Sequence, residues 1–422
     1  MTIIRDLCQC RRKSTWGSGA VSNWIEAEQA AQRLGVKAAT LYTYVSRGIL
    51  TRRKAPDGRS IFSSAEIEEL ARRGRPRRQA GSTELVIESA VTMLGEDRHN
   101  YRGQDAIYLA EYKHPEEVAI LLWTGVEPDD RQSVRAFAPV SDAVKVAREA
   151  QSGLPPAVLL LERLQLIVTA LAVADPVRLN LDPAVVVETG RGLMSGMIAA
   201  LPHHGRVKTI DSLAMHAQLF WKLASAKADE RLTDVLRFIM VLLADHELAA
   251  STLAARVAAS VRADPYAVVA AGLGVTSGAL HGGASLGVES MLTEIKKPDE
   301  TAYVMGERLR RGERISGFGH AVYRNGDARA VALMQKLRMA VPGHRRLAVA
   351  EAMIEEAHLR GLPPMNVDFP LGLFTHLAGM PRGAGEAIFG ISRTVGWLAH
   401  AMEEYKKPTQ LRLRAAYTGP TG

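Results

Sequence analysis

The chain of 422 residues carries a formal net charge of +8, with 53 Lys and Arg against 45 Asp and Glu. This length allows two or three domains with a sizeable core, and 47% hydrophobic residues are ordinary for a globular protein. Two cysteines, Cys8 and Cys10, exclude a disulfide framework and are too few ligands for a closed zinc site. Because the N-terminus also lacks the apolar core of a secretory signal, we predict a cytoplasmic protein without a metal site.

The positive charge is concentrated at one end of the chain. Residues 1–80 hold 16 Lys and Arg against 7 Asp and Glu, whereas the remainder holds 37 against 38. This asymmetry indicates a basic module joined to a neutral body. One charge-free stretch, residues 266–288, is 23 residues long but contains six glycines. We therefore predict a buried helix followed by a glycine-rich turn, and no membrane association.

The N-terminal region shows a sequence of short elements. Residues 1–22 have no apolar periodicity, and we expect them to be disordered. Apolar spacing predicts helices over residues 26–34 and 37–47, separated by a glycine-containing turn. Residues 49–53 and 59–62 flank a Pro-Asp-Gly segment, which is typical of a hairpin, and a third helix should follow.

This region resembles the winged helix-turn-helix modules of the MerR and excisionase type, through AEQAAQRLGVKAATLYTYVSRGIL and the hairpin after it. The resemblance implies such a module, with a basic linker, over residues 23–80. In that family the second helix enters the DNA major groove. Candidate DNA contacts from the second helix and the hairpin are Lys37, Thr40, Tyr42, Thr43, Arg47, Arg52 and Arg53, with Lys54 and Arg59 as further phosphate contacts. A module that mediates only protein contacts or tethering is the alternative.

From about Gly81 onward, Ala, Leu, Val and Met recur at helical spacing, with almost no strand signal. This pattern predicts a large, mainly α-helical body. The clearest predicted helices cover residues 157–174, 211–226, 232–243, 246–261 and 328–339.

Three segments of the body place an ionisable residue beside glycine or a turn. They are SGALHGGASLG around His281, RISGFGHAVYRNGDARA around His320, and MNVDFPLG around Asp368. Two histidines and a carboxylate on loops are suited to general acid–base catalysis. Spacing alone does not bring the three together, and each residue taken singly is equally consistent with a structural hydrogen-bonding role.

Ordered motifs then relate the body to a known family. ALHGGA, GFGHAVY, DARA, NVDF and SRTVGWLAHAMEE occur in this order, together with YRGQDAIYLAE and a terminal YTG. On these motifs the chain from Gly81 to its end resembles the citrate synthase family. The resemblance implies the all-α citrate synthase fold, with a large domain of residues 81–282 plus 377–422 and a small domain of residues 283–376. It also implies that the two domains close on oxaloacetate.

The resemblance assigns a role to each loop residue. Asp368 would take a proton from the methyl carbon of acetyl-CoA, and His281 would stabilise the resulting enol. His320 would polarise the keto group of oxaloacetate and protonate the new alkoxide. A helix predicted over residues 284–294 would keep His281 neutral, because a helix N-terminus disfavours an imidazolium. Acetyl-CoA is a co-substrate, and no cofactor is implied.

Oxaloacetate carries two carboxylates and needs cationic partners, for which arginine is favoured. By motif position the resemblance implies these substrate-binding residues: His246, Arg329, Arg393 and Arg412. Arg324 matches a position that contacts CoA phosphates. In this family the C-terminal arginine reaches the active site of the neighbouring subunit, so Arg412 implies a homodimer with shared active sites. A higher oligomer built from such dimers is the alternative.

The sequence departs from the family near the substrate. Pro370, Leu371 and Gly372 follow Phe369 where Ser-Gly is common, and Leu413 and Ala416 replace a common proline and arginine. These changes bear on the choice of acyl donor or of oxo acid. The predicted function is a citrate synthase that condenses acetyl-CoA, oxaloacetate and water. The alternatives are a 2-methylcitrate synthase using propionyl-CoA, and a DNA-binding, metabolite-sensing regulator built on the same body.

Overall fold

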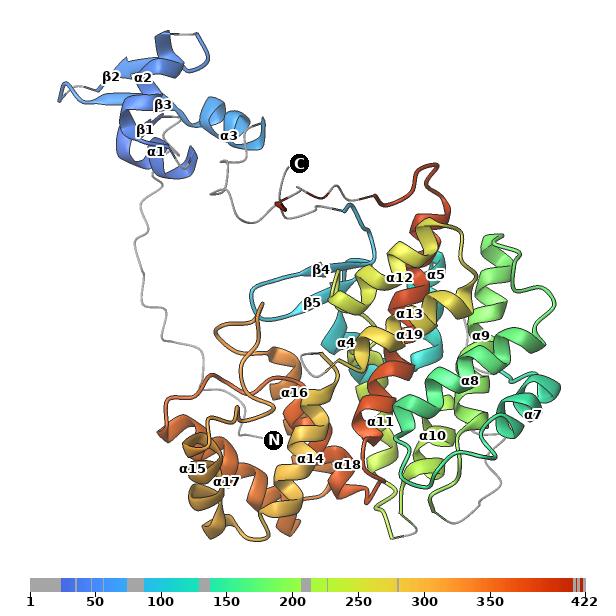
Figure 1. Cartoon of the computed structure of the whole chain (residues 1–422). Helices are drawn as coiled ribbons and strands as arrows, with labels where there is room; N and C mark the ends of the chain where they lie inside the picture. The colour runs from blue at the N-terminus through green and yellow to red at the C-terminus, as the bar shows by residue number, and fades with distance from the viewer. Residues whose placement is uncertain are drawn as a thin grey trace, which may run out of the picture. The chain divides into compact units, whose positions relative to one another are not determined.

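The computed structural model describes residues 24–34, 36–46, 48–55, 57–73, 87–128, 137–205, 214–225, 227–278, 281–412, 415 and 418–419. The predicted disordered tail, both cysteines, the basic linker and Arg47 lie outside the described residues. The chain divides into two compact units, Met1–Ile87 and Glu88–Gly422 (Figure 1). None of the described helices combines the length and apolar character that a membrane span requires.

The N-terminal unit contains short helices around a small antiparallel sheet. Its strands are β1 (Trp24–Glu26), β2 (Arg52–Lys54) and β3 (Ser60–Ser63), in the order β1-β3-β2, and its helices are α1 (Ala27–Leu34), α2 (Ala38–Ser46) and α3 (Ser64–Arg73). Ala30, Ala31, Leu34 and Leu41 are buried, as the helical spacing predicted. The prediction was wrong at Glu26, which lies in β1 and pairs with Ile61 instead of starting the helix.

The body also contains a sheet that the sequence did not predict. β4 (Thr92–Leu94), β5 (His99–Tyr101) and β6 (Gln104–Asp105) form an antiparallel meander. Strands of two or three residues are too short for period-2 alternation to be recognised. Arg102 and Gly103, both with positive φ (49° and 86°), make the turn between β5 and β6.

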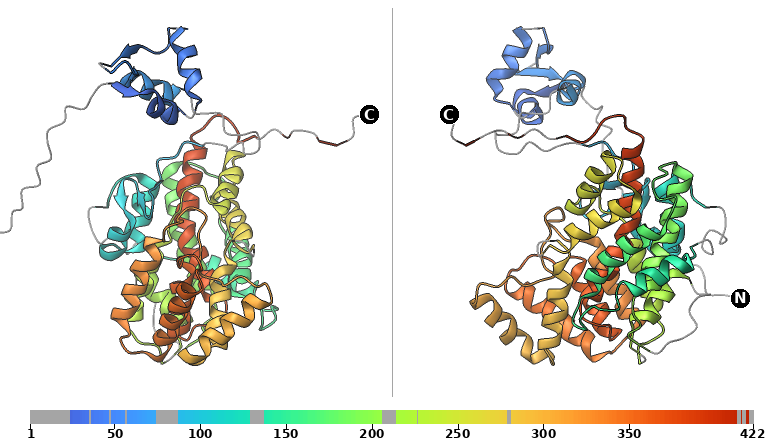
Figure 2. Two further views of the ribbon diagram at one scale, coloured as in Figure 1. Left: turned by 90° about the vertical axis from the view of Figure 1, so that its left-hand side faces the viewer. Right: turned by 45° about the vertical axis from the view of Figure 1, so that its right-hand side comes forward.

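The rest of the body is helical (Figures 1 and 2). Its helices are α4 (Ala106–Tyr112), α5 (Pro115–Thr124), α7 (Ser141–Glu149), α8 (Leu160–Ala174), α9 (Pro183–Ala200), α10 (Met215–Leu223), α11 (Leu232–Leu242), α12 (Ala250–Ser260), α13 (Pro265–Thr276), α14 (Gly283–Glu294), the 3₁₀ turn η1 (Pro298–Glu300), α15 (Thr301–Arg310), α16 (Ala328–Ala340), α17 (Arg345–Leu359), α18 (Asp368–Leu377) and α19 (Ala384–Tyr405).

Several predicted helices were wrong at their ends. The helix predicted from residue 246 begins only at Ala250, because a turn at Asp245–Glu247 precedes α12 and Glu247 has a φ of 53°. The helix predicted from residue 157 begins at Leu160, where the Glu162 carboxylate accepts a hydrogen bond from Leu159 N. The helix predicted over residues 211–226 is described as Met215–Leu223.

Helix α19 runs through the middle of the body, and residues all around it are buried (Figure 2). It packs against α12, α13, α5, α8 and α9, which explains its apolar and small residues on every face. Gly396 permits one close approach: a Cβ there would lie 2.1 Å from Asp245 Oδ1. Gly272 of α13 permits another, because its Cβ would lie 2.5 Å from the Trp397 ring.

Helices α14 to α18 gather at one end of the body (Figures 1 and 2). α14 and α18 pack closely at Gly372, where a Cβ would lie 2.8 Å from the Val288 side chain. Asp368 is the first residue of α18, and His281 lies two residues before α14.

Candidate active site

The loops that carry His320 and Asp368 are joined to each other. Phe318 and Met365 form an antiparallel β-bridge. Asn366 Nδ2 donates to the Gly319 carbonyl at 2.7 Å, and Asn366 Oδ1 accepts from Asp368 N at 3.0 Å. One amide side chain therefore links the residue before His320 to the backbone of Asp368, the first residue of α18.

His320 is held in one orientation by backbone donors. Its Nδ1 accepts from Val322 N at 3.0 Å and from Tyr323 N at 3.2 Å. The neutral ring must then carry its proton on Nε2. Burial, aided by the Arg329 charge, lowers the pKa of His320 below its usual value. The side chain is thus a neutral hydrogen-bond donor near neutral pH.

Three histidines lie together with Tyr323. His246 Nε2 is 2.9 Å from Tyr323 Oη, and the His246 ring centroid lies 5.4 Å from that of His320 and 5.6 Å from that of His99. Burial lowers the pKa of His246 well below its usual value and that of His99 to about 3, and the nearby Arg329 charge lowers both further. These rings are therefore uncharged at neutral pH, and the cluster gains its positive potential from arginine.

Two buried arginines, Arg329 (2% exposed) and Arg393 (1% exposed), border the histidines. Arg329 Nε and Nη2 each donate to the Asp327 carboxylate at 2.9 Å, which also accepts from Val367 N at 3.2 Å. Arg393 Nε donates to the Leu243 carbonyl at 2.9 Å, and its guanidinium lies 4.6 Å from the Phe389 ring centroid. Two desolvated guanidiniums beside neutral histidines make a strong site for a small anion.

The Asp368 carboxyl is poised to exchange a proton. Burial raises its pKa to about 6, with Arg329 and Arg393 opposing the rise. At pH 7 the group is mostly ionised and is a stronger base than an exposed aspartate. A carboxylate tuned in this way is suited to act as a general base.

His281 lies just before α14, whose start at Gly283 agrees with the predicted helix. Its Nε2 is 2.8 Å from Ser251 Oγ, and burial lowers its pKa to about 4. Its ring centroid is 5.9 Å from that of Phe389, the ring over which Arg393 lies. The structure therefore places His281 beside the arginine that also borders the histidine cluster.

A buried polar network holds the turn that carries His246. Asp245 accepts from Thr92 Oγ1 at 2.5 Å and lies 3.3 Å from His400 Nε2. Arg256 Nη1 donates to His400 Nδ1 at 2.7 Å and Nε donates to Glu404 at 2.7 Å. The network spans β4, α12 and α19, so it fixes the turn at Asp245 against three elements of the body.

Sequence reasoning missed His99 and Tyr323. His99 is 1% exposed, and among the described residues neither of its ring nitrogens has a hydrogen-bond partner. The only available signal was its position two residues before Tyr101, in the YRG motif. A buried histidine with two unsatisfied nitrogens facing an anion site is a candidate for contact with the bound anion.

Two predicted residues, Arg324 and Arg412, are exposed, unlike the buried arginines of the cluster. In the N-terminal unit, Lys37, Tyr42, Thr43, Arg52 and Arg53 are exposed and Thr40 is half-buried. Arg59 is already paired, with Glu26 and Asp57 both at 2.5 Å.

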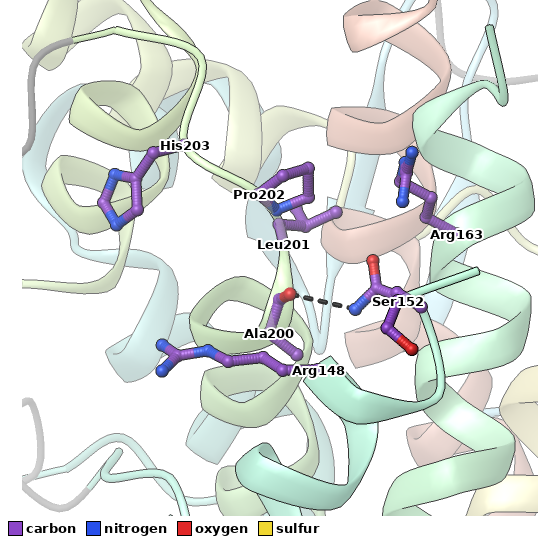
Figure 3. Close-up of a pocket in the computed structure, with 8 residues that line it drawn as sticks. Arg148, Ser152, Arg163, Ala200, Leu201, Pro202 and His203 are labelled. Carbon is purple, nitrogen blue, oxygen red and sulfur yellow. Dashed lines mark hydrogen bonds between the residues drawn. The ribbon is translucent and has the colours of Figure 1, made fainter. Parts of the chain in front are cut away.

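A separate cavity of about 370 Å³ lies between α7, α8 and α9 (Figure 3). Arg148 and Arg163 line it from two of these helices, and His203 lines it from the segment after α9. None of its lining residues belongs to the histidine and arginine cluster. The cluster around His320, and not this cavity, therefore contains the groups suited to acid–base chemistry.

The sequence matches a family model and curated proteins over most of its length. The model described as "Citrate synthase, C-terminal domain" matches residues 82–414. A citrate synthase of Haloferax volcanii is 33% identical over 361 residues, which cover 79% of this chain and 94% of that protein. A 2-methylcitrate synthase of Mycobacterium tuberculosis is 30% identical over 382 residues, which cover 86% and 95%.

The fold also matches solved structures. The crystal structure of citrate synthase from Thermotoga maritima superposes with a TM-score of 0.68 at 25% identity, covering 82% of this chain and 96% of that one. A ternary complex of citrate synthase from Thermoplasma acidophilum superposes with a TM-score of 0.66 at 23% identity, covering 81% and 95%.

Proposed function

Because the chain belongs to the citrate synthase family, we propose that it condenses the acetyl group of acetyl-CoA with oxaloacetate and water, releasing citrate and CoA. The family needs no cofactor beyond these substrates. The observation that carries the proposal is the joining of Asp368 and His320 by Asn366, beside two buried arginines.

The reaction begins with removal of a proton from the methyl carbon of the thioester. Asp368 accepts this proton, and His281 donates a hydrogen bond to the thioester oxygen as negative charge develops there. Ser251 Oγ is 2.8 Å from His281 Nε2, and we propose the tautomer in which the serine hydroxyl donates to Nε2 and Nδ1–H donates to the substrate. A neutral donor of this kind lowers the barrier because it interacts most strongly with the developing enolate.

Carbon–carbon bond formation follows at the keto carbon of oxaloacetate. The enol carbon attacks while His320 Nε2–H donates to the keto oxygen and protonates the alkoxide that forms. Water then hydrolyses the citryl thioester, which releases CoA. The electron pair of the new bond comes from the enol. The proton removed by Asp368 is released to solvent and His320 regains its proton from solvent, so both groups return to their starting forms.

Arg329, Arg393 and His246 bind the two carboxylates and the keto group of oxaloacetate. Arg412 is exposed in the single chain, so we propose that the partner's Arg412 completes the site in a homodimer. Arg324 lies four residues after His320 and contacts the CoA phosphates.

We propose that residues 283–376 form a small domain that closes on the large domain when oxaloacetate binds. Asp368 and His320 belong to this small domain, whereas His246 and Arg393 belong to the large one. Closure would exclude water before the thioester reacts.

The acyl donor is either acetyl-CoA or propionyl-CoA. Matched relatives are named as citrate synthases and as 2-methylcitrate synthases, and one additional methylene is worth only about 1–3 kcal/mol in a hydrophobic pocket. We propose acetyl-CoA as the main substrate, with propionyl-CoA as the alternative donor.

For the N-terminal unit we propose a winged helix-turn-helix that binds DNA. The order of its helices and hairpin supports this, as do the exposed Lys37 on the approach to α2 and Arg52 and Arg53 on β2. Tyr42 lies beneath the Arg52 guanidinium at 5.6 Å, so α2 and the hairpin present one joint surface. A protein that is both enzyme and DNA binder satisfies all these features, whereas a purely regulatory protein has no use for Asp368.

The deciding experiment measures thiol release from acetyl-CoA and from propionyl-CoA, with and without oxaloacetate. Release that requires oxaloacetate and disappears in Asp368→Ala is the expected result. The ratio of kcat/KM for the two donors then distinguishes a citrate synthase from a 2-methylcitrate synthase. A folded protein that binds oxaloacetate but releases no thiol from either donor would support the regulatory alternative.

A further inference from the structure

A second group of potential ligands lies outside the catalytic cluster, at the beginnings of α5 and α10. His114, Glu116 and His216 each offer a nitrogen or oxygen atom, and these atoms all lie within 4.8 Å of one another. The ring centroids of His114 and His216 are 5.4 Å apart. Residues about a hundred positions apart in the sequence are thus brought to one point by the packing of two helix ends.

Two of the three residues are buried and have a side-chain atom that the protein leaves unsatisfied. Glu116 is 0% exposed, and its Oε2 lacks a hydrogen-bond partner among the described residues, whereas Oε1 accepts from Met215 N at 2.7 Å. His216 is 7% exposed, and its Nδ1 likewise lacks a partner. Burying such groups without partners costs free energy, so an unpaired carboxylate oxygen and an unpaired imidazole nitrogen at one point require an explanation.

We propose that His114, Glu116 and His216 bind one divalent transition-metal ion, with zinc as the favoured ion. Two imidazoles and a carboxylate form a common zinc ligand set, and a water molecule would supply the fourth ligand. Zinc bonds of about 2.0 Å place tetrahedral ligand atoms roughly 3.3 Å apart, so binding requires the three side chains to draw inward. His114 is only half-buried, which provides the path of entry.

A metal ion binds the carboxylate form of glutamate and the neutral form of histidine. Arg237 is the cation that opposes binding, but its guanidinium is already engaged by Asp234 Oδ1 at 2.7 Å and by the Ala110 carbonyl at 2.8 Å.

The ion would have a structural role and not a catalytic one. None of its ligands belongs to the cluster around His320, and the ion would add a link between α5 and α10 to the hydrogen bond from Met215 N to Glu116 Oε1. We therefore expect metal binding to raise the thermal stability of the body.

The test uses the full chain without a histidine tag, treated with a chelator and then incubated with zinc sulfate. After gel filtration, metal analysis should find about one zinc per chain. Glu116→Gln preserves size and the acceptor for Met215 N, and His216→Gln removes one imidazole; each should abolish stoichiometric binding. His358→Gln, at an exposed histidine of α17, is the matched control and should bind zinc like the wild type.

Two further measurements keep the proposal testable if a variant folds poorly. Cobalt(II) bound to the wild-type protein should show the intense visible bands of a four-coordinate ion, and zinc should displace it. Zinc at about 100 times its Kd should raise the melting temperature by about 4 °C, and this shift should be absent in folded Glu116→Gln. The proposal is overturned if the wild type retains no more zinc than Glu116→Gln, or if only weak six-coordinate cobalt bands appear.

Discussion

Replacing Asp368 by asparagine should abolish turnover and at the same time stabilise the fold. Burial raises the pKa of this carboxyl from its ordinary value of 3.8 to about 6. An acid whose pKa is raised by folding binds its proton more tightly in the native state, so it destabilises the fold wherever it is ionised. The penalty is absent below pH 3.8, grows as pH rises and is complete above about pH 6.

The magnitude follows from the shift. About two pKa units correspond to roughly 3 kcal/mol of unfavourable free energy at pH 7, and Asp368→Asn removes the charge while retaining the backbone bond from residue 368 N to Asn366. The body, Glu88–Gly422, has an unfolding entropy of about 0.7 kcal/mol/K at about 2.1 cal/mol/K per residue. The variant should therefore melt up to about 4 °C above the wild type at pH 7.

Thermal melts of the two proteins, followed by circular dichroism at pH 7 and pH 4.5, test this reasoning. The difference in melting temperature should be positive at pH 7 and should shrink at pH 4.5, where the wild-type carboxyl is protonated. Asp368→Ala is a poor substitute because it also removes buried volume. A difference that is negative at pH 7, or unchanged between the two pH values, would refute the account of Asp368 as a strained, ionised base.

Further changes test other parts of the structure. Ser251→Ala removes the group 2.8 Å from His281 Nε2 and should lower kcat by roughly tenfold, while KM for oxaloacetate stays within twofold. His99→Leu removes two unsatisfied ring nitrogens and should raise the free energy of unfolding by about 1–3 kcal/mol in urea melts; a rise in KM for oxaloacetate would show that this ring also contacts substrate. Arg52→Ala should weaken DNA retention and reduce the salt slope by about 1 in mobility-shift titrations, whereas Arg59→Ala, whose guanidinium is already paired with two carboxylates, should change neither.

The candidate catalytic residues could be proposed from the sequence, but their arrangement could not. His281, His320 and Asp368 each stood out beside glycine or a turn in recognisable motifs. Nothing in their spacing indicated that Phe318 would pair with Met365, because that bridge joins residues far apart in the sequence. The geometry of the site therefore depends on tertiary contacts that local patterns do not encode.

Residues that acquire meaning only through packing were missed. His99 has no local sequence signal of function, and its place in the cluster becomes evident only from its contact with His246. His114 and Glu116 are typical of a helix start, and only the fold brings His216 to them. The short strands of the body escaped prediction for a related reason: their register is fixed by the turn at Gly103 and by partners, and not by alternation over two or three residues. Long helices such as α11 and α16, whose periodicity extends over several turns, were predicted nearly to their ends.

The Asn366 link described above bears on when the reactive groups become aligned. Its amide holds the Gly319 carbonyl on one side and the Asp368 backbone on the other, so the segments that carry the proposed proton acceptor and proton donor are joined when the chain folds and not when substrate arrives. The entropy of bringing these two groups together is therefore lost once, during folding, and is not subtracted from the binding energy of each substrate molecule. Substrate encounters a pair of reactive groups whose mutual orientation is already set, and its own binding energy remains available for positioning the thioester against them.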